Sequence, residues 1–176
     1  MEFKKVAICV LAIAAMGCST LQVSSDYAPG TDFSKYKSFT IKRGEAGQYQ
    51  IAADRLMNAL ENALKARGLA SVPEGGDLNV FMHITLGKDT QLNTTGYGYG
   101  GWGGWRWGGG MQTTTVQQIP TGTLVVDLVD AKSKTAVWRG IAKDEIKTSA
   151  TPEERTQHAN DAAAQLFANF PPKAAK

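Results

Sequence analysis

The chain has 176 residues, of which 43% are hydrophobic and 20% are charged, and its formal net charge is +3 at pH 7. These proportions exclude a globally disordered chain and predict one folded domain behind an N-terminal signal. The charge is too small, and its Lys and Arg residues are too scattered, to indicate a nucleic-acid partner. Because Cys9 lies within the expected signal, the mature chain keeps only Cys18, which excludes an internal disulfide.

The N-terminus has the pattern of an export signal. Lys4 and Lys5 precede a run of ten apolar or small residues, 6–15. Ten helical residues cover about 15 Å, roughly half of a bilayer core, so this run is too short for a permanent span. We therefore expect residues 1–17 to be a signal peptide.

The segment Ala15-Met16-Gly17-Cys18 resembles the lipobox of bacterial lipoproteins. In that family a diacylglyceryl group is attached to the cysteine and the chain is cleaved just before it. Gly17 fits the pattern, whereas Ala15 stands where leucine is usual and Met16 where a small residue is usual. Ser19 resembles the signal for sorting to the outer membrane. The alternatives are an ordinary signal peptide with a chance cysteine, or an uncleaved anchor.

Hydrophobic periodicity predicts the elements that follow a tether at residues 18–32. Leu21 and Val23 could alternate in a short strand. The remaining expected elements are strands at 36–42, 77–88, 123–129 and 136–146, a strand-like stretch at 113–119, and helices at 49–67 and 151–170. The second helix begins with the N-cap pattern Thr151-Pro152-Glu153-Glu154. An antiparallel sheet with two helices on one face buries every apolar stripe.

The predicted fold class is therefore α+β, a two-layer sandwich with a mainly antiparallel sheet, two helices on one face and a hairpin loop rich in glycine and aromatic residues. A single domain is expected over residues 33–172, followed by a tail at 173–176.

Residues 96–110 form the predicted hairpin loop. Nine of these fifteen residues are glycine, and three of the chain's four tryptophans lie among them. One interpretation is a long, mobile, low-complexity decoration. The other is a contact surface, because aromatic rings suit sugar faces, bilayer interfaces and protein partners alike, and we expect an envelope protein or a glycan as the partner. The candidate contact residues are Tyr97, Tyr99, Trp102, Trp105, Arg106 and Trp107. The formal G-x-G-x-x-G match in this segment is expected by chance from so many glycines.

No other pattern in the sequence predicts catalysis, a metal or a cofactor. His83 and His158 share no zinc-ligand spacing with each other or with cysteine. The acidic residues Asp127, Asp130, Asp144 and Glu145 are interpreted as solvated charges at strand edges and turns. We therefore expect no catalytic residue, no metal ligand and no cofactor-binding residue.

Several short motifs, in their order and spacing, resemble DUF4136, a family of bacterial lipoproteins that carry a domain of unknown function. These motifs are F-x-x-Y-x-S-F at 33–39, L-x-x-R-G at 64–68, D-L-x-V at 77–80, G-T-L-x-V-D at 122–127, V-W-R-G at 137–140 and F-P-P at 170–172. The resemblance implies a small envelope lipoprotein without an established activity, in which a glycine-rich aromatic loop is common. Within these motifs we interpret Trp138 as a core residue and Gly140 as a bulge or a site of close packing.

Together, these observations predict a non-enzymatic, lipid-anchored protein of the bacterial cell envelope, held by Cys18 on the outer membrane and facing the periplasm. Its role would be structural or binding, through the loop at 96–110. The alternative is a ligand-binding or hydrolytic domain acting on cell-wall or glycan material, which a pocket with converging Asp, Glu or His side chains would favour.

Overall fold

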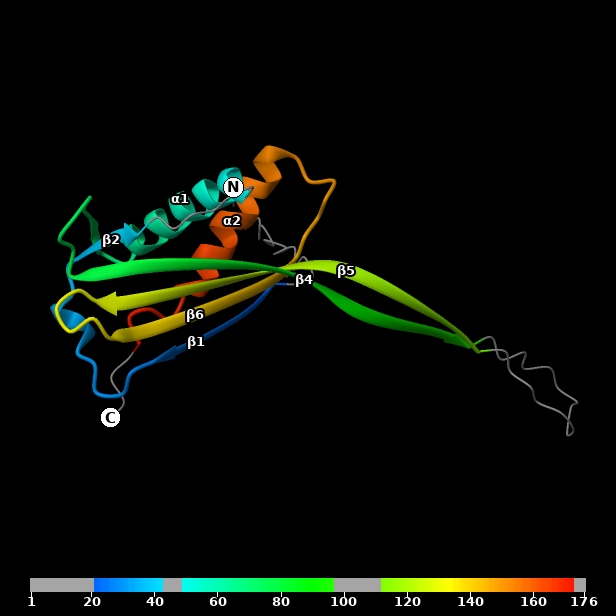
Figure 1. Ribbon diagram of the computed structural model, residues 1–176, viewed down its shortest axis with the longest axis horizontal. Coiled ribbons are helices and arrows are strands. Elements are labelled where there is room, and N and C mark those ends of the chain that lie inside the picture. Colours follow the sequence, from blue (N-terminus) through cyan, green and yellow to red (C-terminus); the bar gives the residue numbers. More distant parts are fainter. Residues whose placement is uncertain (1–20, 43–48, 97–111, 173–176) are drawn as a thin grey trace, which may run out of the picture.

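The computed structural model describes residues 21–42, 49–96 and 112–172, with the side chains of 91–96 and 112–113 left out. The described elements are β1 (Gln22–Tyr27), the 3-10 turn η1 (Phe33–Lys35), β2 (Ser38–Lys42), α1 (Gln50–Ala66), β3 (Ala70–Ser71), β4 (Leu78–Gly96), β5 (Gln112–Asp130), β6 (Ala136–Glu145) and α2 (Pro152–Leu166). They form a mixed α+β fold, as the sequence predicts. Figure 1 shows α1 and α2 on the same side of the sheet.

The sheet has six strands in the order β1-β6-β5-β4-β2-β3. The pairs β1–β6, β6–β5 and β5–β4 are antiparallel. By contrast, β2 is parallel to both β3 and β4. This parallel part follows from α1, which carries the chain from the end of β2 back to the start of its neighbours, as parallel strands require. The expectation of a mainly antiparallel sheet therefore holds for β1, β6, β5 and β4, whereas β2 and β3 form a parallel part at the other edge.

Both predicted helices are confirmed, because each has a strong local signal. The buried side chains of α1 recur at helical spacing along one stripe, at Ala53, Met57, Leu60 and Leu64. Gly68 follows the helix with a φ of 86°, the left-handed conformation that glycine tolerates.

Helix α2 begins with the predicted capping box. The hydroxyl group of Thr151 accepts a hydrogen bond from the backbone N–H of Glu154, and the Glu154 carboxylate accepts one from the backbone N–H of Thr151. Pro152 occupies the first helical position, where a missing N–H costs nothing. The start of α2 is thus specified within four residues.

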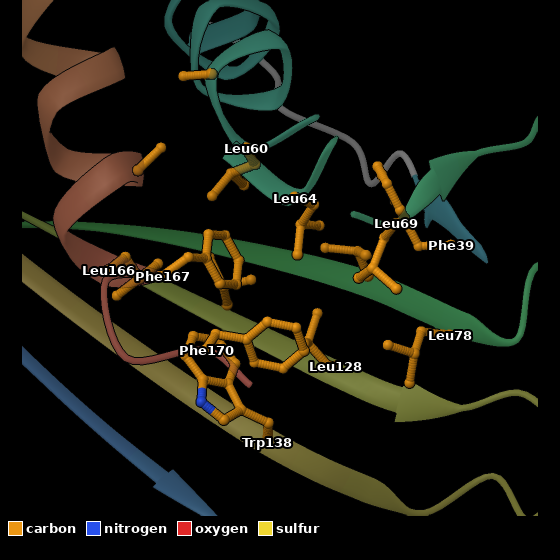
Figure 2. Packing of buried hydrophobic residues seen from close by; sticks show 14 of the residues in the cluster. Phe39, Leu60, Leu64, Leu69, Leu78, Leu128, Trp138, Leu166, Phe167 and Phe170 are labelled. Carbon is orange, nitrogen blue, oxygen red and sulfur yellow. The ribbon is translucent and has the colours of Figure 1, made fainter. Parts of the chain in front are cut away.

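Aromatic packing between α2 and β6 fixes one end of the core, as Figure 2 shows. The ring of Trp138 stacks on Phe167 with centroids 5.0 Å apart and meets Phe170 edge-on at 5.6 Å. Gly140 lets these elements approach, because a Cβ there would lie 2.8 Å from Cδ1 of Leu166 and would overlap the Trp138 ring. The interpretation of Trp138 as a core residue and of Gly140 as a site of close packing is confirmed.

Strands β4 and β5 are longer than the sequence predicts. The expected strand at 77–88 continues to Gly96, and the two stretches expected at 113–119 and 123–129 form one continuous strand. Pro120 does not interrupt the ladder between β4 and β5. The carbonyl oxygen of Pro120 accepts a hydrogen bond from the Ile146 N–H at 2.8 Å. The backbone of Pro120 therefore faces the residue after β6 and not β4, so the N–H that proline lacks is not needed between β4 and β5.

Candidate functional site

The most distinctive feature of the structure is an arm, which we define as residues 88–96 of β4 and 112–120 of β5. The two strands pair in continuous antiparallel register as far as Gly96 and Gln112. Their other neighbours end earlier: β2 leaves β4 at Phe81, and β6 leaves β5 at Thr121. Figure 1 shows the arm projecting from the body of the protein. At about 3.4 Å per residue, nine residues extend roughly 30 Å.

The arm adds little to the stability of the domain. The buried side chains of the cluster around Trp138, Phe167 and Leu60 all come from elements of the body. A two-stranded ribbon is at best marginally stable by itself, and its outer edges lack neighbouring strands among the described residues. A projection that is weak in itself, and whose described side chains take no part in the core, requires another explanation, and presentation of a surface supplies one.

The two faces of the arm differ in chemistry because successive side chains point to opposite sides of a strand. One face carries Val116, whose residue surface is 60% exposed, with Leu92 directly opposite it in the register. At the root of the arm the same face holds Leu86, 46% exposed, and the exposed Lys88. We call this the Val116 face. The exposed polar residues Thr90 and Gln118 also lie on this face, which is the more apolar of the two because of Val116 and Leu86.

The opposite face is mainly polar. It includes Thr115, Gln117 and Asp89, with Ile119 half-buried beside them. Asp89 is bound by Lys143 of β6, whose Nζ lies 2.7 Å from Oδ2 of the carboxylate. This ion pair crosses the root of the arm and ties it to the body. The only two charged residues of the described arm, Lys88 and Asp89, therefore lie on opposite faces.

The predicted contact residues lie outside the described residues. Tyr97, Tyr99, Trp102, Trp105, Arg106 and Trp107 belong to the segment 97–111. That segment begins and ends where Gly96 and Gln112 stand opposite each other at the end of the arm. The structure therefore brings the two ends of the segment together, about 30 Å from the body of the sheet.

Cys18, the predicted site of lipid attachment, also lies outside the described residues, but β1 begins only four positions later at Gln22. Four residue steps span at most about 14 Å. Gln22 pairs with Lys143, which pairs with Thr123, which pairs with Thr85. This row crosses the sheet three residues before the arm begins. β1 thus begins at the end of the sheet from which the arm projects.

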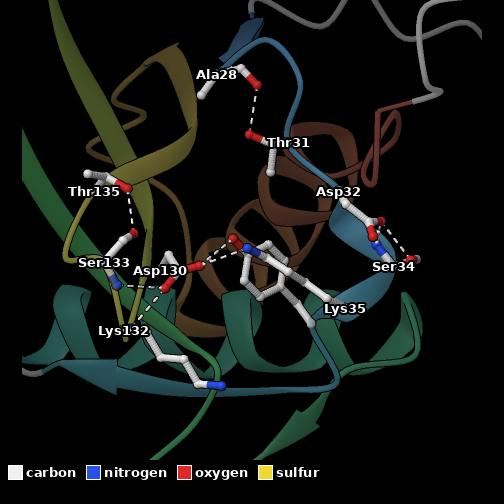
Figure 3. Close-up of polar contacts among 10 residues, drawn as sticks. Ala28, Thr31, Asp32, Ser34, Lys35, Asp130, Lys132, Ser133 and Thr135 are labelled. Carbon is white, nitrogen blue, oxygen red and sulfur yellow. Dashed lines mark hydrogen bonds and ion pairs between the residues drawn. The ribbon is translucent and has the colours of Figure 1, made fainter.

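Asp130 is the centre of a polar cluster that joins the β5–β6 turn to η1, shown in Figure 3. It is only 6% exposed. Its carboxylate accepts hydrogen bonds from the N–H groups of Lys132 and Ser133 at 2.8 and 3.0 Å, and from the Tyr36 hydroxyl at 2.8 Å. Lys35 adds an ion pair at 3.1 Å. The bonds from Ser133, Tyr36 and Lys35 hold the pKa of the Asp130 carboxyl well below its usual range. Every one of these contacts stabilises a turn.

Asp127 forms a second ion pair, on the sheet face that points away from the helices. Its two carboxylate oxygens accept bonds from Nε and Nη2 of Arg139 at 2.6 and 2.8 Å. The two residues stand directly opposite each other on β5 and β6. The interpretation of Asp127 and Asp130 as solvated charges is therefore wrong, because both are buried against specific partners. Asp144 and Glu145 are half-buried.

The described residues offer no grouping typical of a metal centre. No cluster of three or more His, Cys, Asp or Glu side chains with metal-binding geometry occurs in the described ranges. His83 lies exposed on the sheet, and His158 lies exposed on α2. Within the same ranges, no helix is both long and apolar enough to cross a membrane.

A depression of about 500 Å³ lies beside α1. It is lined by Ile41, Met57, Asn58, Glu61, Ser71, Val72 and Pro73. Glu61 is its one acidic residue, and its carboxylate is bound by Lys65 at 2.7 Å. A single paired carboxylate does not supply the two acidic groups that glycoside hydrolysis typically requires. The depression therefore gives little support to the hydrolytic alternative.

These features define a class of protein, namely a small α+β domain from which one hairpin arm projects. Within that class the chain belongs to the family described as "Domain of unknown function (DUF4136)", whose model matches residues 23–172. Comparison with curated protein sequences gives no match.

Solved structures share the fold at low sequence identity. A PDZ domain protein from Parabacteroides distasonis matches with a TM-score of 0.58 and 12% identity, covering 88% of this chain. The chain spans only 37% of that protein. The PelC dodecamer from Paraburkholderia phytofirmans matches with a TM-score of 0.50 and 12% identity, covering 84% of this chain and 94% of PelC. At such identities the likeness shows the fold alone.

Sequence reasoning missed the arm as a unit. The signal was present in the β-branched residues on both sides of the glycine-rich segment, Thr94 and Thr95 before it and Thr113 to Val116 after it. Placed in register, these two stretches face each other around the loop. Their polar composition on both faces hid the alternation by which strands are usually recognised.

Proposed function

We propose that this chain is a lipid-anchored protein of the bacterial cell envelope with a non-enzymatic binding role, and that the residues at the end of its arm make the contact. The observation that carries the proposal is the arm itself, which reaches roughly 30 Å from the body and whose described side chains take no part in the core. The segment at its end holds five aromatic residues and Arg106. Such rings combine apolar faces with polar tips and suit contact with a protein or a glycan.

The fold supports a binding role for a further reason. We infer that the domain is a two-layer sandwich, in which two helices cover one face of the sheet. Its core gives the arm a firm base, because β4 and β5 run without interruption from the buried Leu78 and Leu128 into the arm. A rigid base with a projecting loop is a common arrangement for binding surfaces.

The proposed anchor is a lipid on Cys18, left as the first residue after removal of 1–17. The lipobox-like lead-in and Ser19 support an outer-membrane position facing the periplasm. Labelled palmitate, given to cells that produce the chain or its Cys18→Ala variant, tests this part of the proposal. Label in the parent chain and none in the variant is expected. Equal labelling of both would contradict lipid attachment at Cys18.

The contact itself is tested by combining Trp102→Ala, Trp105→Ala and Trp107→Ala in one chain. Tyr49→Ala is the matched control, because Tyr49 is an aromatic residue of the body that is exposed at 42%. Crosslinking in intact cells, followed by mass spectrometry, identifies neighbours of each variant. We expect the triple variant to lose crosslinked partners that Tyr49→Ala retains. Identical partner sets for all three chains would overturn the binding role of the segment.

A further inference from the structure

The position of the anchor relative to the arm suggests what the arm itself touches. β1 begins at the end of the sheet from which the arm projects, and four residue steps, at most about 14 Å of chain, separate Cys18 from Gln22. An arm of roughly 30 Å that starts there lies well within reach of any membrane that holds the lipid. This step rests on the proposed lipid attachment.

Of the two faces of the arm, the Val116 face has the chemistry that better matches a lipid surface. The Val116 face exposes Leu86 and Val116 and carries the cation Lys88. Thr90 and Gln118 add polar groups to this face, whereas the opposite face carries the anion Asp89 together with Thr115 and Gln117. Apolar side chains with a basic residue suit the interface of an anionic bilayer, whereas a carboxylate does not.

We propose that the Val116 face of the arm rests on the surface of the membrane to which Cys18 anchors the protein. The contact is weak by itself, since few apolar side chains take part, and the nearby anchor makes it effective by raising the local concentration of lipid. A two-stranded ribbon twists along its length, so Val116, which lies far from the root, is the residue of this face to test.

A second copy of the chain is the competing occupant. The arm beyond Asp89 has no charged residue in its described part, so two arms would not repel each other. Pairing between copies, however, uses the strand edges and gives no reason for Lys88 and the exposed apolar side chains to share one face. The segregation of these residues favours the membrane.

The test uses the mature chain with Cys18, its only cysteine, coupled chemically to a maleimide lipid in vesicles of phosphatidylethanolamine and phosphatidylglycerol. Amide hydrogen exchange of residues 112–120 is compared with that of the same chain capped by a soluble maleimide. Two variants are matched: Val116→Asp on the proposed contact face, and Gln117→Asp on the opposite face. Both residues are exposed, so both variants should fold.

We expect coupling to vesicles to slow exchange in the arm by about fivefold or more, while β6 stays unchanged. Val116→Asp should abolish this effect, and Gln117→Asp should retain it. Unchanged exchange in the parent chain, or an equal loss in both variants, would overturn the proposal. Protection that needs no vesicles and grows with protein concentration would assign the face to a second copy. Because the coupling is chemical, these results do not depend on whether cells lipidate Cys18, which palmitate labelling decides.

Discussion

The hydroxyl group of Tyr36 donates a 2.8 Å hydrogen bond to the buried carboxylate of Asp130, although 94 positions separate the two residues in the sequence. This bond joins the segment after η1 to the turn between β5 and β6. Replacement of Tyr36 by Phe keeps the ring and removes the donor. We expect a loss of about 1 kcal/mol in the free energy of unfolding, as for a typical side-chain hydrogen bond. Urea unfolding, followed by circular dichroism, measures it, and an unchanged midpoint would show that the bond contributes nothing.

Asp130 also predicts how stability depends on pH. Hydrogen bonds from the Ser133 N–H, the Tyr36 hydroxyl and Lys35 lower the pKa of its carboxyl in the folded state. A lowered pKa stabilises the fold above the pKa of the unfolded chain, about 3.9, and this contribution is lost as the pH falls from there toward the folded-state value. We expect Asp130→Asn to be less stable than the parent at pH 7 and the difference to shrink below pH 4. A constant difference across this range would contradict the assignment.

Two glycines in adjacent strands provide a matched pair for close packing. A methyl group at Gly140 would lie 2.8 Å from Cδ1 of Leu166 and would overlap the Trp138 ring, whereas one at Gly122 would meet Cγ1 of Ile146 at an ordinary 3.6 Å. Gly140→Ala should therefore destabilise the domain by about 1–3 kcal/mol, the usual cost of overpacking. Gly122→Ala should have a clearly smaller effect. Thermal unfolding of both variants measures the difference in destabilisation. Equal stabilities of the two variants would contradict the prediction and show that the core relaxes around position 140.

The sequence predicts those parts of the fold that are encoded locally. The signal for the start of α2 is contained in four residues, Thr151 to Glu154, and the apolar residues of α1 recur at helical spacing. Both helices could therefore be found without tertiary information. The burial of Asp130 could not be predicted, because its partner Tyr36 is distant in the chain and no residue near Asp130 in the sequence indicates this contact. The parallel pairing of β2 with β4 is hidden for the same reason.

The candidate site was predicted only in part. The aromatic segment is obvious from composition, but the arm that leads to it has polar residues on both faces, such as Gln117 and Gln118 at successive positions of β5. Its extent became visible only from the register that sets Leu92 opposite Val116. That β1 begins at the end of the sheet from which the arm projects likewise depends on pairing across four strands.

The arm can be removed by a defined replacement. Because Pro120 directs its backbone toward β6, the adjacent Gly87 and Thr121 form a hydrogen-bonded pair between β4 and β5. A two-residue Asn-Gly turn closes such a pair in a type I′ hairpin. Replacing residues 88–120 by Asn-Gly should leave the core intact, since none of the core residues lies in the replaced segment.

The most direct test of the binding role is crosslinking with mass spectrometry in intact cells that produce either the parent chain or this shortened chain at equal levels. A thermal unfolding midpoint within a few degrees of the parent value verifies the fold first. The account predicts a folded, shortened protein that has lost the crosslinked partners of the parent chain. A folded, shortened protein with the full set of partners would contradict it, because contact would then belong to the body and not to the arm.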